Sequence, residues 1–274
     1  MPHNRPMANT AWQQRIRRAE KLSEQYPFAA EILGFYQHVA KFQEDVYREI
    51  DGGMAGVSPA VLQDRSAANP FERQLLARFP QFLNVVQKHG PERVAQAARE
   101  LRSAADDVWS DLLNSVWFQA NESPASPEEF LAFALLQPYA EFVRLHFRLQ
   151  LEGYTQALCP LCNRKPAMGV LRQQGDGGRR SLVCGFCMTE WEFRRVVCPG
   201  CGQENHAKLP VYTAETIPHI RVECCDDCKT YIKSIDLTKN GLADPLVDEL
   251  AAVPLNLWAQ EHGYAKLQPN LLGM

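Results

Sequence analysis

The feature that most constrains this chain is a cluster of cysteine pairs in its C-terminal half. Eight of the nine cysteines form Cys-x-x-Cys pairs between positions 159 and 228. The pairs are Cys159/Cys162, Cys184/Cys187, Cys198/Cys201 and Cys225/Cys228. Two intervening residues let one tight turn direct both sulfurs to a single ion, and a second such turn completes a tetrahedron. The pattern therefore predicts two four-sulfur metal sites, each holding iron or zinc, because both metals accept four thiolates.

Two other uses of paired cysteines fit the chain less well. Disulfides are typical of small secreted domains, but residues 1–10 contain no apolar core of a signal peptide and the chain is long enough to bury a core without staples. Thioredoxin-like chemistry uses a single pair at a strand–helix junction rather than four pairs among Gly and Pro. A reducing, cytoplasmic location is expected.

The intervals between the pairs indicate how they combine. Cys162 and Cys184 are separated by 21 residues and Cys201 and Cys225 by 23, whereas only 10 residues separate Cys187 from Cys198. The two long intervals contain hairpin material, with a glycine-rich turn at 175–178 in the first and short β-branched runs at 211–213 and 220–222 in the second. Two successive rubredoxin-like or zinc-ribbon modules are predicted. An interleaved cross-brace, with the first pair joined to the third, is the alternative.

The residues around the pairs suit metal-binding turns. Asn163 and Gly202 follow two of the pairs, and both residue types tolerate the left-handed backbone such turns require. Cys224, directly before Cys225, points to the opposite face of an extended chain, so we expect a bystander thiol rather than a swapped ligand or a reactive thiol. His206 and His219 are expected to be loop residues, since eight thiolates already suffice.

The N-terminal half has no cysteine and shows helical periodicity. Apolar residues recur at steps of four and three from Phe28 to Ile50, and similar patterns occupy 71–88, 92–119 and 127–150. With a first helix near 11–24, about five helices are expected, and Pro80 and Pro138 should kink or break two of them. The predicted fold is a multidomain α+β protein with an all-α domain at 1–157, a first rubredoxin-like module at 158–197, and a second module with a C-terminal tail at 198–274.

Charge and motifs exclude several functions. Residues 159–274 contain 13 basic and 13 acidic side chains, whereas nucleic-acid binding usually requires a positive excess. The longest charge-free apolar stretch lies near 130–140, far short of the ~20 residues that span a bilayer. Walker, Gly-x-Ser-x-Gly and His-Glu-x-x-His motifs do not occur in the sequence. We therefore expect no nucleic-acid partner, no membrane span and no catalytic residue.

The cysteine-rich half resembles a known family. Its signature comprises Cys184-Gly-Phe-Cys187-Met-Thr-Glu-Trp191, Arg194-Arg195, Cys198-Pro-Gly-Cys201, Tyr212-Thr-Ala-Glu215, Arg221-Val-Glu-Cys-Cys225-Asp-Asp-Cys228-Lys-Thr-Tyr231-Ile-Lys233, Ala243-Asp244-Pro245 and Asp248-Glu249-Leu250-Ala251. This order and spacing resembles the formate dehydrogenase accessory protein FdhE family over residues 158–274. The chain departs from the family pattern at Cys224, which is an extra cysteine, and at Glu249 and Asn256, where aspartates are expected.

The resemblance implies a cytoplasmic maturation factor that is not an enzyme. Such a factor binds the catalytic subunit of a respiratory, molybdenum- or tungsten-containing formate dehydrogenase before that enzyme is exported. A rubredoxin-type electron carrier and a nucleic-acid-binding zinc ribbon are the alternatives. An electron carrier requires iron that cycles reversibly, and a nucleic-acid binder requires steep salt dependence.

Candidate partner-binding residues lie close to the metal ligands. Thr189, Glu190 and Trp191 follow Cys187 by two to four residues, and tryptophan is favoured as an anchor in protein interfaces. The alternative is that Trp191 packs between the modules. Further interface candidates are Glu215, Tyr231 and Lys233.

Overall fold

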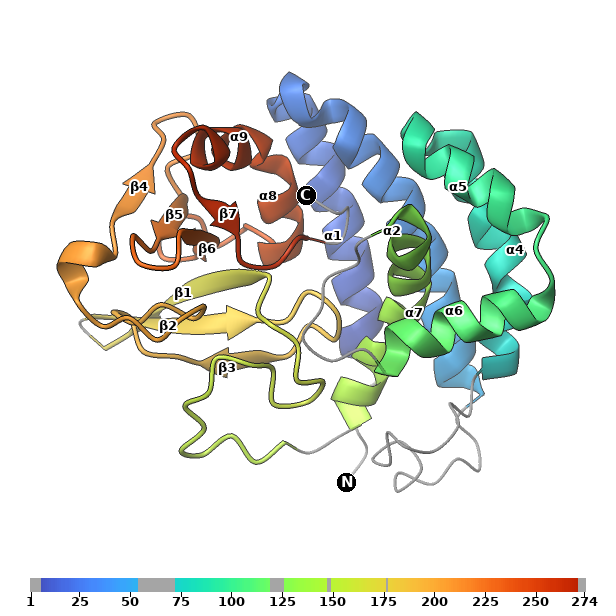
Figure 1. The fold of residues 1–274 in the computed structure, drawn as a ribbon, viewed down its shortest axis with the longest axis horizontal. Helices are drawn as coiled ribbons and strands as arrows, with labels where there is room; N and C mark the ends of the chain where they lie inside the picture. The colour runs from blue at the N-terminus through green and yellow to red at the C-terminus, as the bar shows by residue number, and fades with distance from the viewer. Residues whose placement is uncertain (1–5, 54–71, 119–125, 147–148, 176, 271–274) are drawn as a thin grey trace.

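The structure, a computed structural model, describes residues 6–53, 72–118, 126–146, 149–175 and 177–270. Helices gather on one side of the molecule and strands on the other (Figure 1). The helical region comprises α1 (Pro6–Gln25), the short η1 (Pro27–Ala29), α2 (Ala30–Gly52), α4 (Glu72–His89), α5 (Glu92–Arg102), α6 (Asp106–Phe118) and α7 (Pro127–His146). An all-α region followed by two cysteine-rich modules is the predicted fold class, and it is confirmed.

Each region predicted to be helical contains a helix, but residues 149–150, at the end of the predicted 127–150 helix, are not helical. The pattern predicted as one helix over 92–119 forms two, because the chain turns at residues 103–105 between α5 and α6. Pro80 and Pro138 lie inside α4 and α7, which continue past them, so no break occurs at either proline. Tertiary packing outweighs the lost hydrogen bond, since α7 is buried without interruption from Phe130 to Val143.

The two modules form one continuous sheet. Its strands are β1 (Met168–Gln174), β2 (Gly177–Val183), β3 (Glu190–Glu192), β4 (Val211–Thr213), β5 (Ile220–Cys224), β6 (Thr230–Asp236) and β7 (Ala265–Lys266). The order β3-β2-β1-β6-β5-β4 places an antiparallel triplet from each module side by side, with β7 added to β6. The predicted hairpins are both present, since β1 pairs with β2 and β4 with β5 in antiparallel register.

A parallel pair of strands joins the two modules. Met168 to Leu171 of β1 lie beside Lys233 to Asp236 of β6. The strands approach so closely that a Cβ at Gly169 would collide with Oγ of Ser234. The junction therefore requires glycine at this position, unless Ser234 moves.

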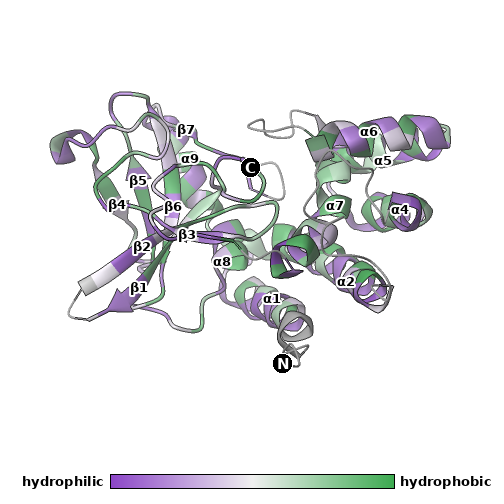
Figure 2. Ribbon diagram, turned by 90° about the horizontal axis from the view of Figure 1, so that it is seen from below, coloured by the Kyte–Doolittle hydropathy of each residue, from purple (hydrophilic) through white to green (hydrophobic). Residues whose placement is uncertain are grey.

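The C-terminal tail forms two helices that were not predicted, α8 (Pro245–Ala251) and α9 (Val253–Glu261). The carboxylate of Asp244 caps α8 by accepting hydrogen bonds from the backbone N–H groups of Leu246 and Val247. Residues 246–251 of α8 are all buried. The helix lies between α1 and the sheet, contacting α1, α2, β1 and β6 (Figure 2). It therefore connects the helical region to both modules.

The helices and the sheet share a buried interface at the first module. The ring of Phe186 packs against Phe133 and Trp117, with centroid separations of 4.7 and 5.9 Å. Gln137 donates a hydrogen bond of 2.9 Å to the carbonyl of Gly185. The boundaries predicted at 157/158 and 197/198 fall in connecting segments before the first and third cysteine pairs, and the independent folding of these parts stays a prediction. Among the described residues, no helix is long and apolar enough to cross a membrane.

Candidate metal centres

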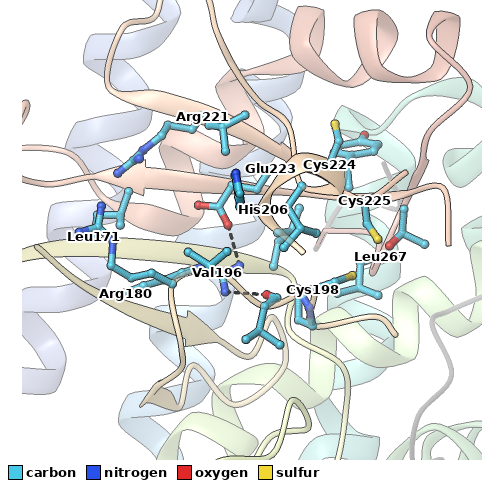
Figure 3. Close-up of a pocket in the computed structure, with 18 residues that line it drawn as sticks. Leu171, Arg180, Val196, Cys198, His206, Arg221, Glu223, Cys224, Cys225 and Leu267 are labelled. Carbon is cyan, nitrogen blue, oxygen red and sulfur yellow. Dashed lines mark hydrogen bonds and ion pairs between the residues drawn. The ribbon is translucent and has the colours of Figure 1, made fainter. Parts of the chain in front are cut away.

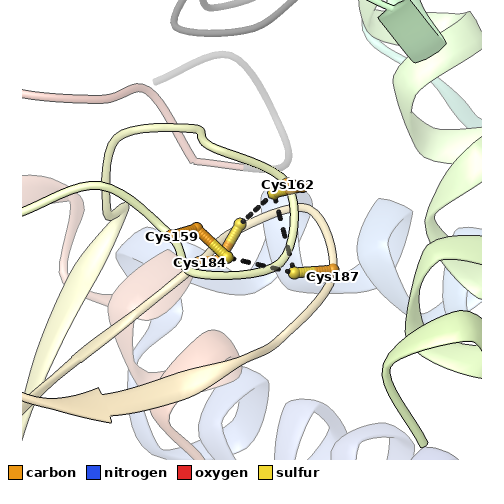
Figure 4. A group of neighbouring side chains, drawn as sticks. All are labelled: Cys159, Cys162, Cys184 and Cys187. Atoms are coloured by element: carbon orange, nitrogen blue, oxygen red, sulfur yellow. Dashed lines mark hydrogen bonds between the residues drawn. The ribbon is translucent and has the colours of Figure 1, made fainter. Parts of the chain in front are cut away.

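The eight paired cysteines gather into two groups of four. The first group consists of Cys159, Cys162, Cys184 and Cys187, and the second of Cys198, Cys201, Cys225 and Cys228. Within each group the sulfur atoms all lie within 4.8 Å of one another, and Figure 4 shows those of the first group converging. Consecutive pairs thus combine, as the interval lengths predicted, and the interleaved cross-brace does not occur.

The sulfur separations match a tetrahedral metal site. Four sulfurs at 2.3 Å from a central ion are about 3.8 Å apart, from the geometry of a tetrahedron. In the first group, Cys159 and Cys187 are 3.5 Å apart, Cys162 and Cys184 3.4 Å, and Cys162 and Cys187 3.7 Å. In the second group, the Cys198–Cys228 and Cys201–Cys225 separations are 3.7 and 3.6 Å. These sulfur–sulfur distances are only slightly shorter than the spacing expected around a bound ion.

All four cysteine pairs adopt the same turn. The residue after each second cysteine has a positive φ, at 59° for Asn163, 54° for Met188, 79° for Gly202 and 54° for Lys229. Asn163 and Gly202 were expected in this conformation, but Met188 and Lys229 were not, because neither residue type favours it.

A backbone hydrogen bond closes each of these turns. The N–H of the first cysteine donates to the carbonyl five residues later, for instance from Cys159 to Arg164 at 2.8 Å and from Cys225 to Thr230 at 2.9 Å. The backbone of each turn therefore directs both sulfurs toward the centre of the cysteine group.

Neighbouring hydrogen bonds support the sulfurs at equivalent positions in the two groups. The hydroxyl of Thr189 lies 3.1 Å from Sγ of Cys187, and that of Thr230 lies 3.1 Å from Sγ of Cys228. A hydroxyl that donates to a thiolate stabilises its charge. Thr189, predicted to bind a partner, is instead buried with an exposed fraction of 2% beside the metal-binding group.

The two groups differ in exposure. All four cysteines of the first group are buried, whereas Cys201 of the second is exposed and Cys228 is half-buried. Burial raises the pKa of the Cys184 and Cys187 thiols well above their ordinary value, and raises that of Cys198 to about 12. So many thiols cannot all ionise in so small a volume unless a cation neutralises them, which is the condition a bound metal satisfies.

Cys224 stands apart from both groups, as predicted. It is the last residue of β5 and is buried. Burial and the neighbouring charge of Asp226 raise the pKa of its thiol to about 12. Because the thiolate is the reactive form, this environment disfavours a reactive thiol at Cys224.

Like Thr189, three further proposed interface residues are buried, and the hypothesis that Trp191 is an exposed anchor is wrong. Trp191 has an exposed fraction of 2% and donates its indole N–H to the carbonyl of Gln156 at 3.1 Å. Tyr231 is 1% exposed and donates to Oδ1 of Asn256 at 3.0 Å, while Lys233 is fully buried. The C-terminal tail and the segment that precedes Cys159 pack against the sheet and cover these side chains.

The remaining interface candidates are accessible. Glu190 is half-buried and forms a bidentate ion pair with Arg172, with N–O distances of 2.9 and 3.0 Å. Glu215 is exposed in the turn between β4 and β5. Their contact with a partner stays a prediction.

A buried lysine–glutamate cluster attaches the tail to the sheet. Nζ of Lys233 lies 2.9 Å from Oε1 of Glu249, which also accepts from Lys266 at 2.5 Å, and Asn270 donates to the other carboxylate oxygen at 2.8 Å. Burial opposes ionisation of Glu249, but the two ammonium groups outweigh it and lower its pKa to about 2. Glu249 and Asn256, which depart from the family pattern, both make buried polar contacts.

The sequence did not reveal a second buried cluster, which joins the two ends of the chain. Asp248 of α8 accepts two hydrogen bonds from Arg18 of α1, at 2.8 and 2.5 Å, and lies 2.7 Å from Nε2 of His219. Nothing in the local pattern of Arg18 distinguishes it from a solvated helix residue, and its partner is 230 residues away. His219 lies in the turn before β5 and outside both cysteine groups, as predicted, but it is buried and has a structural contact.

A helical region joined to paired four-cysteine ribbons defines a protein of the twin rubredoxin-like class. Residues 158–195 match the model of the FdhE central domain, and residues 196–272 match that of the FdhE C-terminal domain. Over residues 158–272 the chain is therefore similar to the FdhE family.

Similarity to individual proteins extends over the helical half as well. The protein FdhE homolog of Aquifex aeolicus is 28% identical over 271 residues, which is 94% of each chain. The homolog of Pseudomonas aeruginosa is 29% identical over 84% of this chain and 74% of its own. The crystal structure of the FdhE protein from Pseudomonas aeruginosa superimposes with a TM-score of 0.67 at 23% identity, over 97% of this chain and 96% of that one.

Proposed function

We propose that this protein is a cytoplasmic maturation factor that binds the catalytic subunit of a respiratory formate dehydrogenase before the enzyme is exported. The observation that carries the proposal is the match of residues 158–272 to the two FdhE domain models, together with similarity to an FdhE homolog along 94% of the chain. The client and the location are what the family resemblance implies.

The metal sites would serve this function as structural elements. The eight thiolates would hold two ions, iron or zinc, and each ion would supply cross-linking of two turns. Four protein ligands leave no coordination position for a substrate, which favours a role without catalysis. The turn at Cys184–Cys187 carries Phe186 into the helical region, so the first ion would fix the contact between ribbon and helices.

The proposal is tested by capture. The tagged protein is purified anaerobically from cells grown on formate, and co-purified proteins are identified by mass spectrometry. The catalytic subunit of a formate dehydrogenase should be enriched over a tag-only control. The Cys184→Ser/Cys187→Ser variant should lose one metal and lose capture, whereas Cys224→Ser, which removes a cysteine outside both groups, should retain both metals. Absence of any formate dehydrogenase subunit from the wild-type capture would overturn the proposal.

An electron carrier is the second candidate, and the exposure of Cys201 favours it. A solvent-accessible ligand gives an external redox partner a short path to the second site. This function requires iron there that is reduced and reoxidised reversibly. Spectroelectrochemistry of iron-loaded protein tests this function. Absence of a reversible redox couple at the bound iron would exclude an electron carrier.

A further inference from the structure

A hollow lies between the two ribbon modules on the outer face of the sheet (Figure 3). Its volume is about 390 Å³, within the range of ligand-binding pockets. Ile232 of β6 lines it, whereas the next residue, Lys233, bonds to α8. Because successive side chains of a strand point to opposite faces, the hollow lies on the face that α8 leaves uncovered.

The hollow is lined partly by apolar side chains, some buried and some exposed to solvent. Leu171 and Ile232 contribute buried side chains from the two central strands. Val196 and Val211, from opposite sides, also line it and are 50% and 51% exposed. Apolar surface that remains open to water next to a concavity is a feature of binding sites.

A buried ion pair holds the two walls together. Arg180 of β2 is 3% exposed and donates to the backbone carbonyls of Arg194 and Val197. The same guanidinium pairs with Glu223 of β5, at 2.6 Å, across the boundary between the modules. The shape of the hollow is therefore preorganised, and the charge of Arg180 is already neutralised.

Two further arginines supply positive charge at one end. Arg195 is exposed, and no ion pair involves it among the residues that the structure describes. Arg221 has only a long contact of 3.5 Å with Asp236. Both residues, with Leu171, also line a second, more polar hollow of about 430 Å³. The two hollows thus adjoin, with the arginines common to both.

We propose that these hollows bind an extended segment of a protein partner, with an apolar side chain in the first hollow and a carboxylate against Arg195 and Arg221. Charge complementarity favours an acidic group, and the exposed valines favour an apolar neighbour. Two adjoining hollows suit an elongated peptide better than a single small molecule. The inference rests on the proposed function in one respect, since the client dehydrogenase would supply the segment.

Two substitutions in the hollow have matched controls. Arg195→Glu reverses the free charge, and Arg194→Glu makes the same change at the adjacent residue, which does not line the hollow and forms an exposed pair with Glu204. Val196→Asp places a charge in the apolar hollow, and Leu242→Asp makes a similar change at a 77% exposed site elsewhere. Circular dichroism and metal content establish that each variant is folded.

The first measurement is independent of the client. Folded, metal-loaded protein is used to select from a library of random octapeptides. Sequences in which an apolar residue adjoins an acidic one should be enriched, and the affinity of a selected peptide should fall about ten-fold in Arg195→Glu and Val196→Asp but not in the controls. Lack of enrichment would overturn the inference, as would equal binding by all variants. A competition assay with 4-phenylbutyrate tests a small-molecule occupant. If 4-phenylbutyrate displaces the selected peptides and binds as tightly as they do, the hollow is a site for small apolar acids and the inference is overturned.

The second measurement separates this inference from the proposed function. Capture of the dehydrogenase subunit by wild type and controls, with loss in Arg195→Glu and Val196→Asp, would support both. Equal capture by all variants would leave the proposed function intact and overturn the assignment of the hollow to the client. Peptide selection without capture by wild type would support the peptide site and overturn the proposed function. Oligomer formation that depends on Val196 would identify a second copy of this chain as the occupant, which overturns the inference.

Discussion

Asp248→Asn should destabilise the whole protein, because Asp248 links the first helix, α1, to α8 of the C-terminal tail. The side chains of Arg18 and Asp248 are 8% and 1% exposed and form a bidentate pair. Replacing the carboxylate by an amide leaves the Arg18 charge buried without a counter-ion and turns an N–H group toward a donor. Breaking a buried pair in this way costs about 3–5 kcal/mol. Such a loss is a large share of the roughly 5–15 kcal/mol that stabilises a typical protein.

The assay is urea unfolding of metal-loaded protein, followed by circular dichroism and tryptophan fluorescence. With an m-value of roughly 3 kcal/mol/M, the midpoint should fall by about 1 to 2 M. Glu204→Gln is the matched control, since it makes the same change in an exposed pair whose side chains are 62% and 59% exposed. Because solvent screens such an exposed pair, the urea midpoint of Glu204→Gln should stay close to that of wild type. Equal midpoints for Asp248→Asn and Glu204→Gln would refute the reasoning.

The pH dependence of this contribution follows from the pKa of Asp248. Burial opposes ionisation, but hydrogen bonds from Arg18 and His219 outweigh it and lower the pKa. A depressed folded-state pKa adds stability above the unfolded value of about 3.9, and that stability is lost as the pH falls through the folded value. The stability that wild type has over Asp248→Asn should therefore be lost progressively as the pH falls below about 4.

Three further outcomes are expected. Anaerobically purified protein should contain about two metals per chain by elemental analysis, and Cys184→Ser/Cys187→Ser about one, whereas disulfides detected by mass spectrometry would contradict both sites. Trp191→Ala should lower stability by about 3–5 kcal/mol, as expected for a buried aromatic residue, and an unchanged urea midpoint would contradict its burial. Lys233→Met should cost about 3 kcal/mol, because its ammonium group bonds the carbonyls of Glu249 and Ala252 at the end of α8. A variant as stable as wild type would show that these carbonyls find other donors.

Local patterns in the sequence predicted the features that depend on neighbours along the chain. The spacing within each Cys-x-x-Cys pair identified the cysteine groups, because two intervening residues are enough to form the turn, and the interval lengths indicated which pairs combine. Helical periodicity located the N-terminal helices for the same reason, since one face of a helix is set by residues three and four apart. Glycines at 175–178 marked the first hairpin, where Gly175 has a φ of 55°.

Features that depend on distant segments were not predictable in this way. Trp191, Tyr231 and Lys233 follow metal ligands in the sequence and were interface candidates, but the segment before Cys159 and the C-terminal tail cover them. The continuation of α7 through Pro138 depends on packing along its whole length, which no window of sequence contains. The same holds for the division of the pattern at 92–119 into two helices.

The sequence by itself determined the four Cys-x-x-Cys turns, the existence of a helical half and the hairpins, because spacing and periodicity act within a few residues. Only the tertiary structure decided that β1 and β6 join the modules in one sheet, that α8 lies between the sheet and the helices, and that Arg18 pairs with Asp248. The physical reason is that these contacts join segments up to 230 residues apart, and their stability comes from burying shared surface that neither segment defines alone.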